Sequence, residues 1–172
     1  MTKSNLLKLL VIFAVFAIAL GSCKKDEEPK KNIVDIAKEK PEFSTLVQAL
    51  TRSDLSTNYA NVLSGDGPFT VFAPTNAAFT SLLSELGVSS LNDIPAATLE
   101  AVLKYHVVSG KVLSSSLTNG QQVTTLQGST FTVNLTGGAK ITDKNSRVAN
   151  ITTTDIEGSN GVIHVIDKVI LP

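Results

Sequence analysis

Several side chains in the second half of this sequence could take part in acid–base or metal chemistry. They are His106, His164, Asp143, Asp155, Glu157 and Asp167. Two carboxylates that converge in a cleft would indicate hydrolysis, and histidines at metal-ligand spacing would indicate a metal site. The histidines lie far apart and show no HxH or HxxE spacing, so we expect no metal and no cofactor. Nothing ranks these carboxylates above solvated turn residues.

Motifs for other kinds of catalysis are absent from the sequence. It contains neither a Gly-x-Ser-x-Gly nucleophile elbow nor a phosphate-binding glycine loop. The one cysteine, Cys23, follows an apolar N-terminal segment, a position typical of a lipidated residue. We therefore expect no catalytic residue and no enzymatic activity, and the separation of the carboxylates is left for the structure to decide.

Both histidines lie in apolar patterns. His106 follows Leu99 by seven residues and shares the apolar face of a predicted helix. His164 alternates with Val162 and Ile166 in a predicted strand. A buried histidine that bonds to neighbouring backbone groups is the favoured interpretation of both patterns.

The composition excludes several classes of protein. The chain has 15 basic and 15 acidic side chains, so no basic face for nucleic acid is expected. A single cysteine cannot form an intrachain disulfide, and stability must come from a hydrophobic core. Tryptophan is absent and aromatic residues make up 5% of the chain, so platforms for stacking sugars or bases are scarce.

The N-terminus predicts a secretory leader. Lys3 and Lys8 precede an apolar run over residues 9–20, which is too short to cross a bilayer readily as a permanent transmembrane helix. The residues Leu-Gly-Ser-Cys that end at Cys23 resemble a bacterial lipobox. We expect residues 1–22 to be a lipoprotein signal peptide and Cys23 to carry the lipid. The alternatives are an uncleaved anchor and an ordinary leader that happens to contain a cysteine.

A charged stretch follows the cysteine. Residues 24–31 contain lysines, acids and one proline but no apolar residue, which predicts a solvated tether over residues 23–31. The stretch is similar to the acidic signal that sends some lipoproteins of the Bacteroidetes to the outer face of the outer membrane. A plain spacer is the alternative. The expected location is the cell envelope, as a surface-exposed outer-membrane lipoprotein attached to the membrane through its N-terminal lipid.

The remaining residues, 32–172, predict one α+β domain. Up to residue 106 the apolar spacing is mostly helical, with Asn32 and Thr75 as helix caps and Gly87 as a helix end. The stripes are Phe43, Leu46, Val47 and Leu50, then Phe79, Leu82, Leu83 and Leu86, then Leu99, Val102, Leu103 and His106. A short strand at 69–73 interrupts the helices. From Val107 the period becomes two, which predicts a mainly antiparallel sheet system. Phe131, Val133 and Leu135 are expected on its inner face, and Asn160-Gly161 should supply a positive-φ turn before the last strand.

Three ordered segments resemble the fasciclin domain family. They read FTVFAPTNAAF over 69–79, YHVVSG over 105–110 and NGVIHVIDKVILP over 160–172, and the TLQG step lies between the last two at 125–128. The resemblance covers about residues 32–172. It implies a fasciclin-like fold in which N-terminal helices pack on a two-sheet β-wedge. Members of this family act in extracellular adhesion and are not generally enzymes.

The resemblance also suggests residues that could contact a ligand. In animal matrix members, the tyrosine–histidine region and an aspartate–isoleucine pair have been tied to integrin contact. Tyr105 and His106 match the first, and Asp155 and Ile156 match the second. The alternative for the second pair is a core isoleucine beside a solvated turn aspartate.

The expected function is an adhesion or binding module that recognises extracellular matrix, polysaccharide or another cell-surface component. The expected partner is therefore an extracellular protein or glycan, and not nucleic acid. The other possibility is a non-catalytic scaffold protein of the outer-membrane envelope.

Overall fold

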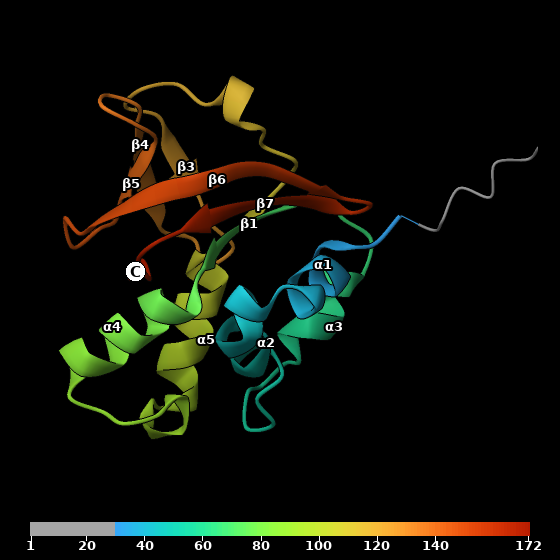
Figure 1. Cartoon of the computed structure of the whole chain (residues 1–172), viewed down its shortest axis with the longest axis vertical. Coiled ribbons are helices and arrows are strands. Elements are labelled where there is room, and N and C mark those ends of the chain that lie inside the picture. Colours follow the sequence, from blue (N-terminus) through green and yellow to red (C-terminus); the bar gives the residue numbers. More distant parts are fainter. Residues whose placement is uncertain (1–29) are drawn as a thin grey trace, which may run out of the picture.

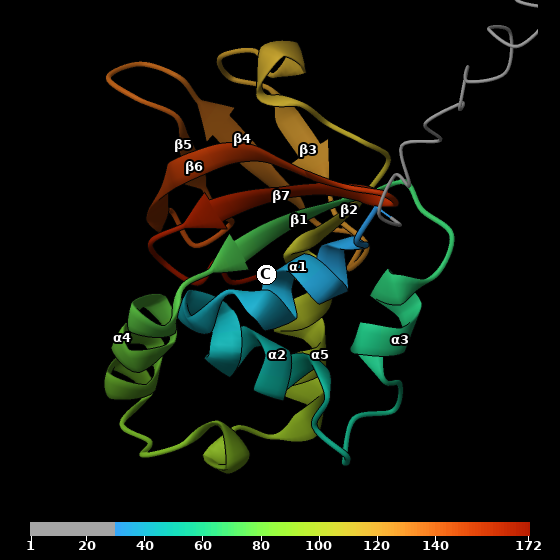
Figure 2. The same ribbon diagram turned by 45° about the vertical axis from the view of Figure 1, so that its right-hand side comes forward.

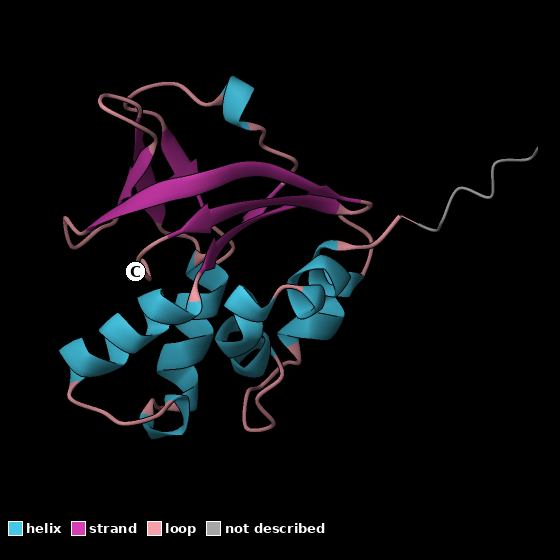
Figure 3. Cartoon of the chain, in the orientation of Figure 1, coloured by secondary structure: helices cyan, strands magenta, loops and turns pink. Residues whose placement is uncertain are grey.

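The computed structural model describes residues 30–172 and has two layers (Figure 1). In this described part, the α-helices lie on one side of a strongly curled sheet, and the turned view shows the same arrangement (Figure 2). Colouring by secondary structure separates the two layers (Figure 3). The predicted signal peptide, Cys23 and residues 24–29 of the tether lie outside the described residues. Among those that are described, no helix has the length and apolar character needed to cross a bilayer.

Three helix ends, at Asn32, Thr75 and Gly87, lie where the sequence predicts them. The α-helices are α1 (Ile33–Glu39), α2 (Ser44–Leu50), α3 (Tyr59–Ser64), α4 (Asn76–Leu86) and α5 (Ala96–Tyr105). Short 3-10 turns are η1 (Pro41–Phe43), η2 (Leu91–Asp93) and η3 (Ser114–Ser116). Asn32 caps α1 by accepting two backbone N–H bonds of 2.9 Å, and Thr75 caps α4. Gly87 ends α4 with a φ of 67°, the left-handed conformation that glycine adopts without strain.

The strands form one mixed, seven-stranded sheet. They are β1 (Phe69–Pro74), β2 (Val107–Ser109), β3 (Gln122–Thr124), β4 (Thr130–Asn134), β5 (Lys140–Thr142), β6 (Val148–Gly158) and β7 (Gly161–Ile166). Their order is β2-β1-β7-β6-β5-β4-β3. The β1–β7 pair is parallel and the other pairs are antiparallel, which confirms the prediction of a mainly antiparallel system.

The long strand β6 joins the two halves of the sheet. Its first residues pair with β5, and the remainder pairs with β7. Register shifts occur between Ile151 and Thr153 and again between Thr153 and Ile156, at the place where the strand passes from one half to the other. Such irregularities bend a strand and increase its twist. The α+β class and the helices packed on a two-part β-wedge are therefore confirmed.

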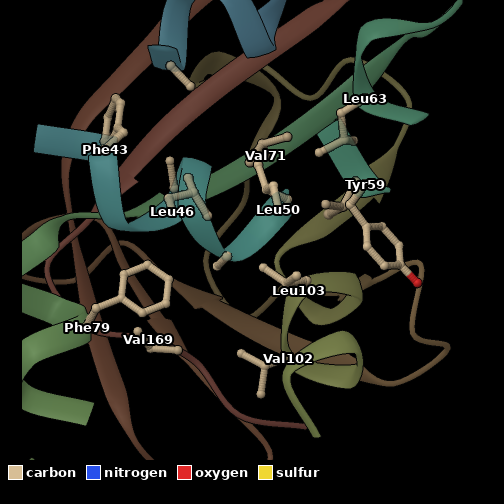
Figure 4. Packing of buried hydrophobic residues seen from close by; sticks show 14 of the residues in the cluster. Phe43, Leu46, Leu50, Tyr59, Leu63, Val71, Phe79, Val102, Leu103 and Val169 are labelled. Atoms are coloured by element: carbon tan, nitrogen blue, oxygen red, sulfur yellow. The ribbon is translucent and has the colours of Figure 1, made fainter. Parts of the chain in front are cut away.

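Two hydrophobic cores lie on the two faces of β1 and β7. The helix-side core fills the space between the helices and these strands (Figure 4). Its labelled members are Phe43, Leu46, Leu50, Tyr59, Leu63, Val71, Phe79, Val102, Leu103 and Val169. The sheet core comprises Phe72, Tyr105, Val108, Leu117, Val123, Phe131, Val133, Ile141, Ala149, Ile166 and Ile170. Full burial of one such side chain stabilises the fold by roughly 1.5–3 kcal/mol.

Three details of the sequence-based prediction are wrong. Leu86 lies on the predicted stripe of α4 but is 50% exposed, because the helix ends there and extends past the core. Leu135 follows the end of β4 and is 37% exposed. Gly161 does not have a positive φ. It is the first residue of β7, opposite Phe69 of β1, where a Cβ atom would overlap the Phe69 carbonyl group.

Candidate functional site

Tyr105 and His106 lie inside the domain and not on its surface. Tyr105 is fully buried in the sheet core, and its hydroxyl donates a 2.8 Å hydrogen bond to the carbonyl oxygen of Thr130. His106 ends α5 and is 3% exposed. Neither side chain can touch a ligand at the surface, which corrects the suggestion that this pair forms direct contacts. The interpretation of His106 as a core histidine is confirmed.

His106 links the end of α5 to the C-terminal segment. Its Nδ1–H donates to the carbonyl oxygen of Val102 at 2.7 Å, and its Nε2 accepts from the Ile170 N–H at 3.2 Å. These roles define a neutral ring with the proton on Nδ1. Burial lowers the pKa of His106 to about 4, and this effect outweighs the Val102 carbonyl and the charge of Asp143, which both act to raise it.

Asp155 lies in an unusual backbone conformation near the bends of β6. Its φ is 57°, a value that a residue other than glycine adopts at a cost. The Asp155 carboxylate accepts a 2.8 Å bond from the Ser114 N–H and a second bond from the Ser114 hydroxyl. These bonds hold the pKa of Asp155 below its usual value, with the Ser114 hydroxyl as the largest cause. Asp155 is half-buried, and its bonds to Ser114 distinguish it from a turn residue that is bonded only to solvent.

We name residues 153–156 the Asp155 bulge. Ile156 is half-buried and packs against the helix-side core, as the alternative interpretation of the aspartate–isoleucine pair expects. Thr153 and Thr154 are exposed beside it. The bulge therefore fixes one aspartate between a core residue and two exposed hydroxyl groups.

Side chains from β1 and β7 hold the segment that faces the Asp155 bulge. We name residues 110–117 the η3 segment. The hydroxyl of the buried Thr70 donates to the Gly110 carbonyl at 2.7 Å and accepts from the Val112 N–H at 2.8 Å. The fully buried His164 contacts the carbonyl oxygen of Val112 through Nε2 at 2.9 Å. The η3 segment is thus tied to the body of the domain by interior groups as well as by Asp155.

Ser114, Asp155 and His164 lie together but are not arranged as a catalytic triad. In nucleophilic catalysis the serine hydroxyl bonds to the histidine, which removes its proton. Here the Ser114 hydroxyl donates to Asp155. The two ring nitrogens of His164 contact the Val112 carbonyl oxygen and the Asp155 N–H. The Ser114 hydroxyl therefore has no histidine as its partner, and its bond to Asp155 joins two segments of the chain.

The four carboxylates that the sequence left open have separate partners. Asp143 accepts backbone N–H bonds from Asn145, Arg147 and Leu171. Asp167 accepts bonds from the backbone and the side chain of Asn150, and Glu157 pairs with Lys111 at 2.6 Å. Together with the Ser114 contacts of Asp155, these bonds account for all four as supports of turns and strands.

A groove lies at the turn between β6 and β7, and its lining on β6 begins at Glu157, the residue after the Asp155 bulge. It consists of two neighbouring hollows of about 640 and 510 Å³, which share Lys111, Gly158 and Ser159 in their linings. We name it the hairpin groove. Lys30 and Lys31 line one hollow, so the chain enters the domain here. Lys111 and Glu157, which form an ion pair, both line the same hollow as Lys30 and Lys31.

Asn160 holds together the elements around the hairpin groove. Its Oδ1 accepts from the Ile33 N–H at 3.0 Å, and its Nδ2 donates to the carbonyl oxygens of Leu63 and Gly65, both at 2.8 Å. Its own carbonyl oxygen accepts from the Phe69 N–H at 3.0 Å. The side chain of Asn160 thus joins the start of α1 to the end of α3, and its backbone carbonyl adds the start of β1.

The sequence analysis missed Ser114, Lys111 and Asn160 as parts of this surface. Ser114 lies 41 residues from Asp155, and Asn160 lies 127 residues from Ile33. No local spacing could reveal such contacts. The one available signal was Asn160 itself, since it begins the third segment of the family resemblance.

A second polar cluster, also missed, lies on the helical side. Glu100 of α5 accepts bonds from the Ser56 and Tyr59 hydroxyls, both at 2.6 Å, and from the Lys104 ammonium at 2.7 Å. These donors lower the pKa of Glu100 to about 2, with Lys104 as the largest cause. Every group in the cluster has a partner, and the cluster joins the loop before α3 to α5.

Comparisons with known proteins agree with this fold. Residues 41–172 match the model of the fasciclin domain. An uncharacterized protein of Synechocystis, sll1735, is 42% identical over 140 residues, which cover 81% of this chain and 97% of that protein. The immunogenic protein MPB70 of Mycobacterium bovis is 32% identical over 139 residues, covering 79% of this chain and 66% of MPB70.

Two further comparisons involve larger proteins. Human periostin is 34% identical over 141 residues, covering 82% of this chain and 16% of periostin. Among solved structures, the FAS1 domain pair of the insect cell adhesion molecule fasciclin I superimposes with a TM-score of 0.68 at 18% identity, covering 84% of this chain and 52% of that chain. The likeness to the solved structure concerns the fold alone. From the family match and these relatives, the chain belongs to the fasciclin domain family.

Proposed function

We propose that this chain is a non-enzymatic adhesion module that binds an extracellular protein through the Asp155 bulge and the adjoining η3 segment. The observation that carries the proposal is the conformation of Asp155. A non-glycine residue at positive φ is costly and persists only where its surroundings fix it. Here Ser114 and His164 fix it from both sides, on a surface where exposed hydroxyl groups and an ion pair gather.

The character of this surface favours a protein over a polysaccharide. Sugars are commonly held against aromatic rings, whereas the described aromatic side chains are buried, apart from a half-exposed Phe69. The surface instead offers threonine and serine hydroxyls, the Lys111–Glu157 pair and the hairpin groove. Such groups form the polar contacts and bridging-water contacts that protein interfaces use.

The first prediction concerns Asp155→Asn. Asparagine tolerates positive φ, so the backbone should remain in place. Its amide offers one acceptor where the carboxylate offers two, and the charge is lost. We expect retention of residues 24–172, a chain that contains all the described residues, to fall about tenfold on immobilised fibronectin or collagen. That loss corresponds to one charge-assisted hydrogen bond. Retention is measured by surface plasmon resonance.

The matched control is Glu85→Gln on α4, which removes a carboxylate from another ion pair, with Arg147. It should leave retention unchanged. Equal losses in the two variants would contradict a site at the Asp155 bulge. Retention on alginate or cellulose but on neither protein would show that the ligand is a polysaccharide. Failure of the unaltered chain to bind any of these probes would favour the envelope-scaffold alternative.

We also propose that Cys23 anchors the domain to the outer membrane, as a surface-exposed lipoprotein. The described chain begins at Lys30, next to the hairpin groove. Lys31 lies eight positions after Cys23 in the sequence, and a fully extended chain of eight such steps reaches about 28 Å. The hairpin end of the domain would therefore stay close to the lipid surface.

Replacing Cys23 with alanine should move the protein from the membrane fraction to the soluble fraction. Several acyl chains on one residue account for firm attachment, and the described residues 30–172 contain no helix that could cross a bilayer in their place. The measurement is fractionation of cells followed by immunoblotting, together with treatment of intact cells with protease to test surface exposure. A Cys23→Ala protein that has lost residues 1–22 and still remains in the membrane fraction would disprove lipid anchoring at this residue.

A further inference from the structure

His164 connects the two segments that form the proposed binding surface. It lies on β7, is fully buried and contacts one backbone group of each segment. The N–H of Asp155 donates to Nδ1 at 3.3 Å, and Nε2 lies 2.9 Å from the carbonyl oxygen of Val112. A ring with its proton on Nε2 satisfies both contacts, because Nε2–H can donate while Nδ1 accepts.

The contact to Asp155 answers a need created by the bulge. The strand register of β6 shifts between Thr153 and Ile156, so the N–H of Asp155 does not lie opposite a β7 residue in the regular ladder. A half-buried N–H without an acceptor is costly. His164 supplies that acceptor from the interior.

The ring of His164 has little freedom to move. Phe72 packs beside it with 5.2 Å between ring centroids and a tilt of 30°. Phe72 in turn contacts Phe131 edge-to-face at 5.0 Å, and both phenylalanines belong to the sheet core. A side chain fixed in this way holds its hydrogen-bond partners in fixed places.

We propose that His164 is a positioning residue for the binding surface: its ring sets the place of Asp155 with one nitrogen and the place of the η3 segment with the other. The inference rests on the proposed function of the Asp155 bulge. Asp155 and Ser114 then bond to each other across the surface because both their segments are held from below. A ligand meets a surface formed in advance, which lowers the entropic cost of binding.

Two substitutions separate the roles of the two nitrogens. The amide oxygen of asparagine takes the place of Nδ1, so His164→Asn keeps an acceptor for Asp155 and loses the donor to Val112. The amide nitrogen of glutamine takes the place of Nε2, so His164→Gln keeps the donor to Val112 and loses the acceptor for Asp155. Both variants exchange an imidazole for an amide, so each serves as the control for the other.

The test is hydrogen–deuterium exchange of the full-length chain extracted in detergent, followed by mass spectrometry. In His164→Gln, amides of residues 153–156 should exchange about tenfold faster, while those of 112–116 change less. In His164→Asn the pattern should reverse. Uniform acceleration of both segments in both variants, or no change in either, would show that His164 only fills space and would overturn the proposal.

Retention on fibronectin or collagen is measured in parallel for both variants. We expect His164→Gln to lose at least as much retention as Asp155→Asn, and His164→Asn to lose less. The two variants can show the expected, opposite exchange patterns while the unaltered chain binds neither probe. In that case the proposed function fails and the positioning role of His164 stands. Equal retention losses in the His164→Asn and His164→Gln variants, together with the same hydrogen exchange pattern in both, would overturn the positioning role.

Discussion

Replacing Gly161 with alanine should lower the free energy of unfolding by about 3–4 kcal/mol, at the upper end of what single substitutions cost. Gly161 begins β7 directly opposite Phe69 in the parallel β1–β7 pair. A Cβ atom there would overlap the carbonyl group of Phe69, and the nitrogen of Phe69 would lie 3.0 Å away. These atoms are backbone, so they cannot rotate aside as a side chain could. The two strands would have to separate at the place where both hydrophobic cores meet them.

The measurement is urea denaturation monitored by circular dichroism, with Gly138→Ala as the matched control. Gly138 has a φ of 111° and open space around its Cβ position. Alanine at that position should cost only the local backbone strain, about 1–2 kcal/mol. Similar costs at the two glycines would contradict the steric explanation. A smaller loss at Gly161 than at Gly138 would show that the β1–β7 pair can separate easily at its end.

Acidification should destabilise the domain through His106, and the effect should reach about 3 kcal/mol. The pKa of His106 is about 4 in the folded chain and 6.5 for a free histidine. Between these values the unfolded chain binds a proton that the folded chain does not, so the free energy of unfolding falls as the pH falls. Full stability is present above pH 6.5, and the loss is complete below pH 4. The folded and unfolded pKa values differ by about 2.5. Each pKa unit corresponds to 1.36 kcal/mol, so the loss of stability is about 3 kcal/mol.

The structural cause is a buried ring whose two nitrogens have opposite roles. A protonated ring would carry a donor at Nε2, facing the N–H donor of Ile170. The positive charge would also lie in the interior, where desolvation is costly. The negative charge of Asp143 opposes this effect without cancelling it.

Urea denaturation at pH 7.0, 5.5 and 4.0 tests this prediction, with His106→Gln as the comparison. Glutamine does not titrate, and its amide oxygen can still accept a bond from Ile170. The variant should be less stable at pH 7 but should lose about 3 kcal/mol less on acidification. Subtracting the free energy of unfolding of His106→Gln from that of the unaltered chain at each pH removes the contribution of every other titrating group. Parallel curves for the two proteins would mean that His106 is not the source of the acid sensitivity.

The sequence alone predicted the elements whose cause is local. The spacing of apolar residues, the caps at Asn32 and Thr75, and Gly87 at the end of α4 each act within one or two helical turns. The burial of His106 was predicted correctly for the same reason, because His106 shares an apolar helix face with Leu99. It also explains the failure at Leu86, because periodicity does not reveal where the supporting core ends.

The family resemblance singled out Asp155 and Ile156, but only the tertiary structure showed which groups surround them. The Asp155 bulge depends on Ser114 and His164, which lie on other elements, and no spacing in the chain predicts that they meet. The requirement for glycine at position 161 likewise comes from Phe69, on a strand 92 residues earlier in the chain. Local patterns fix helices and strands because their hydrogen bonds and faces repeat at short range. The site arises where the long strand β6 bends between the two halves of the sheet, and that bend depends on how distant segments pack.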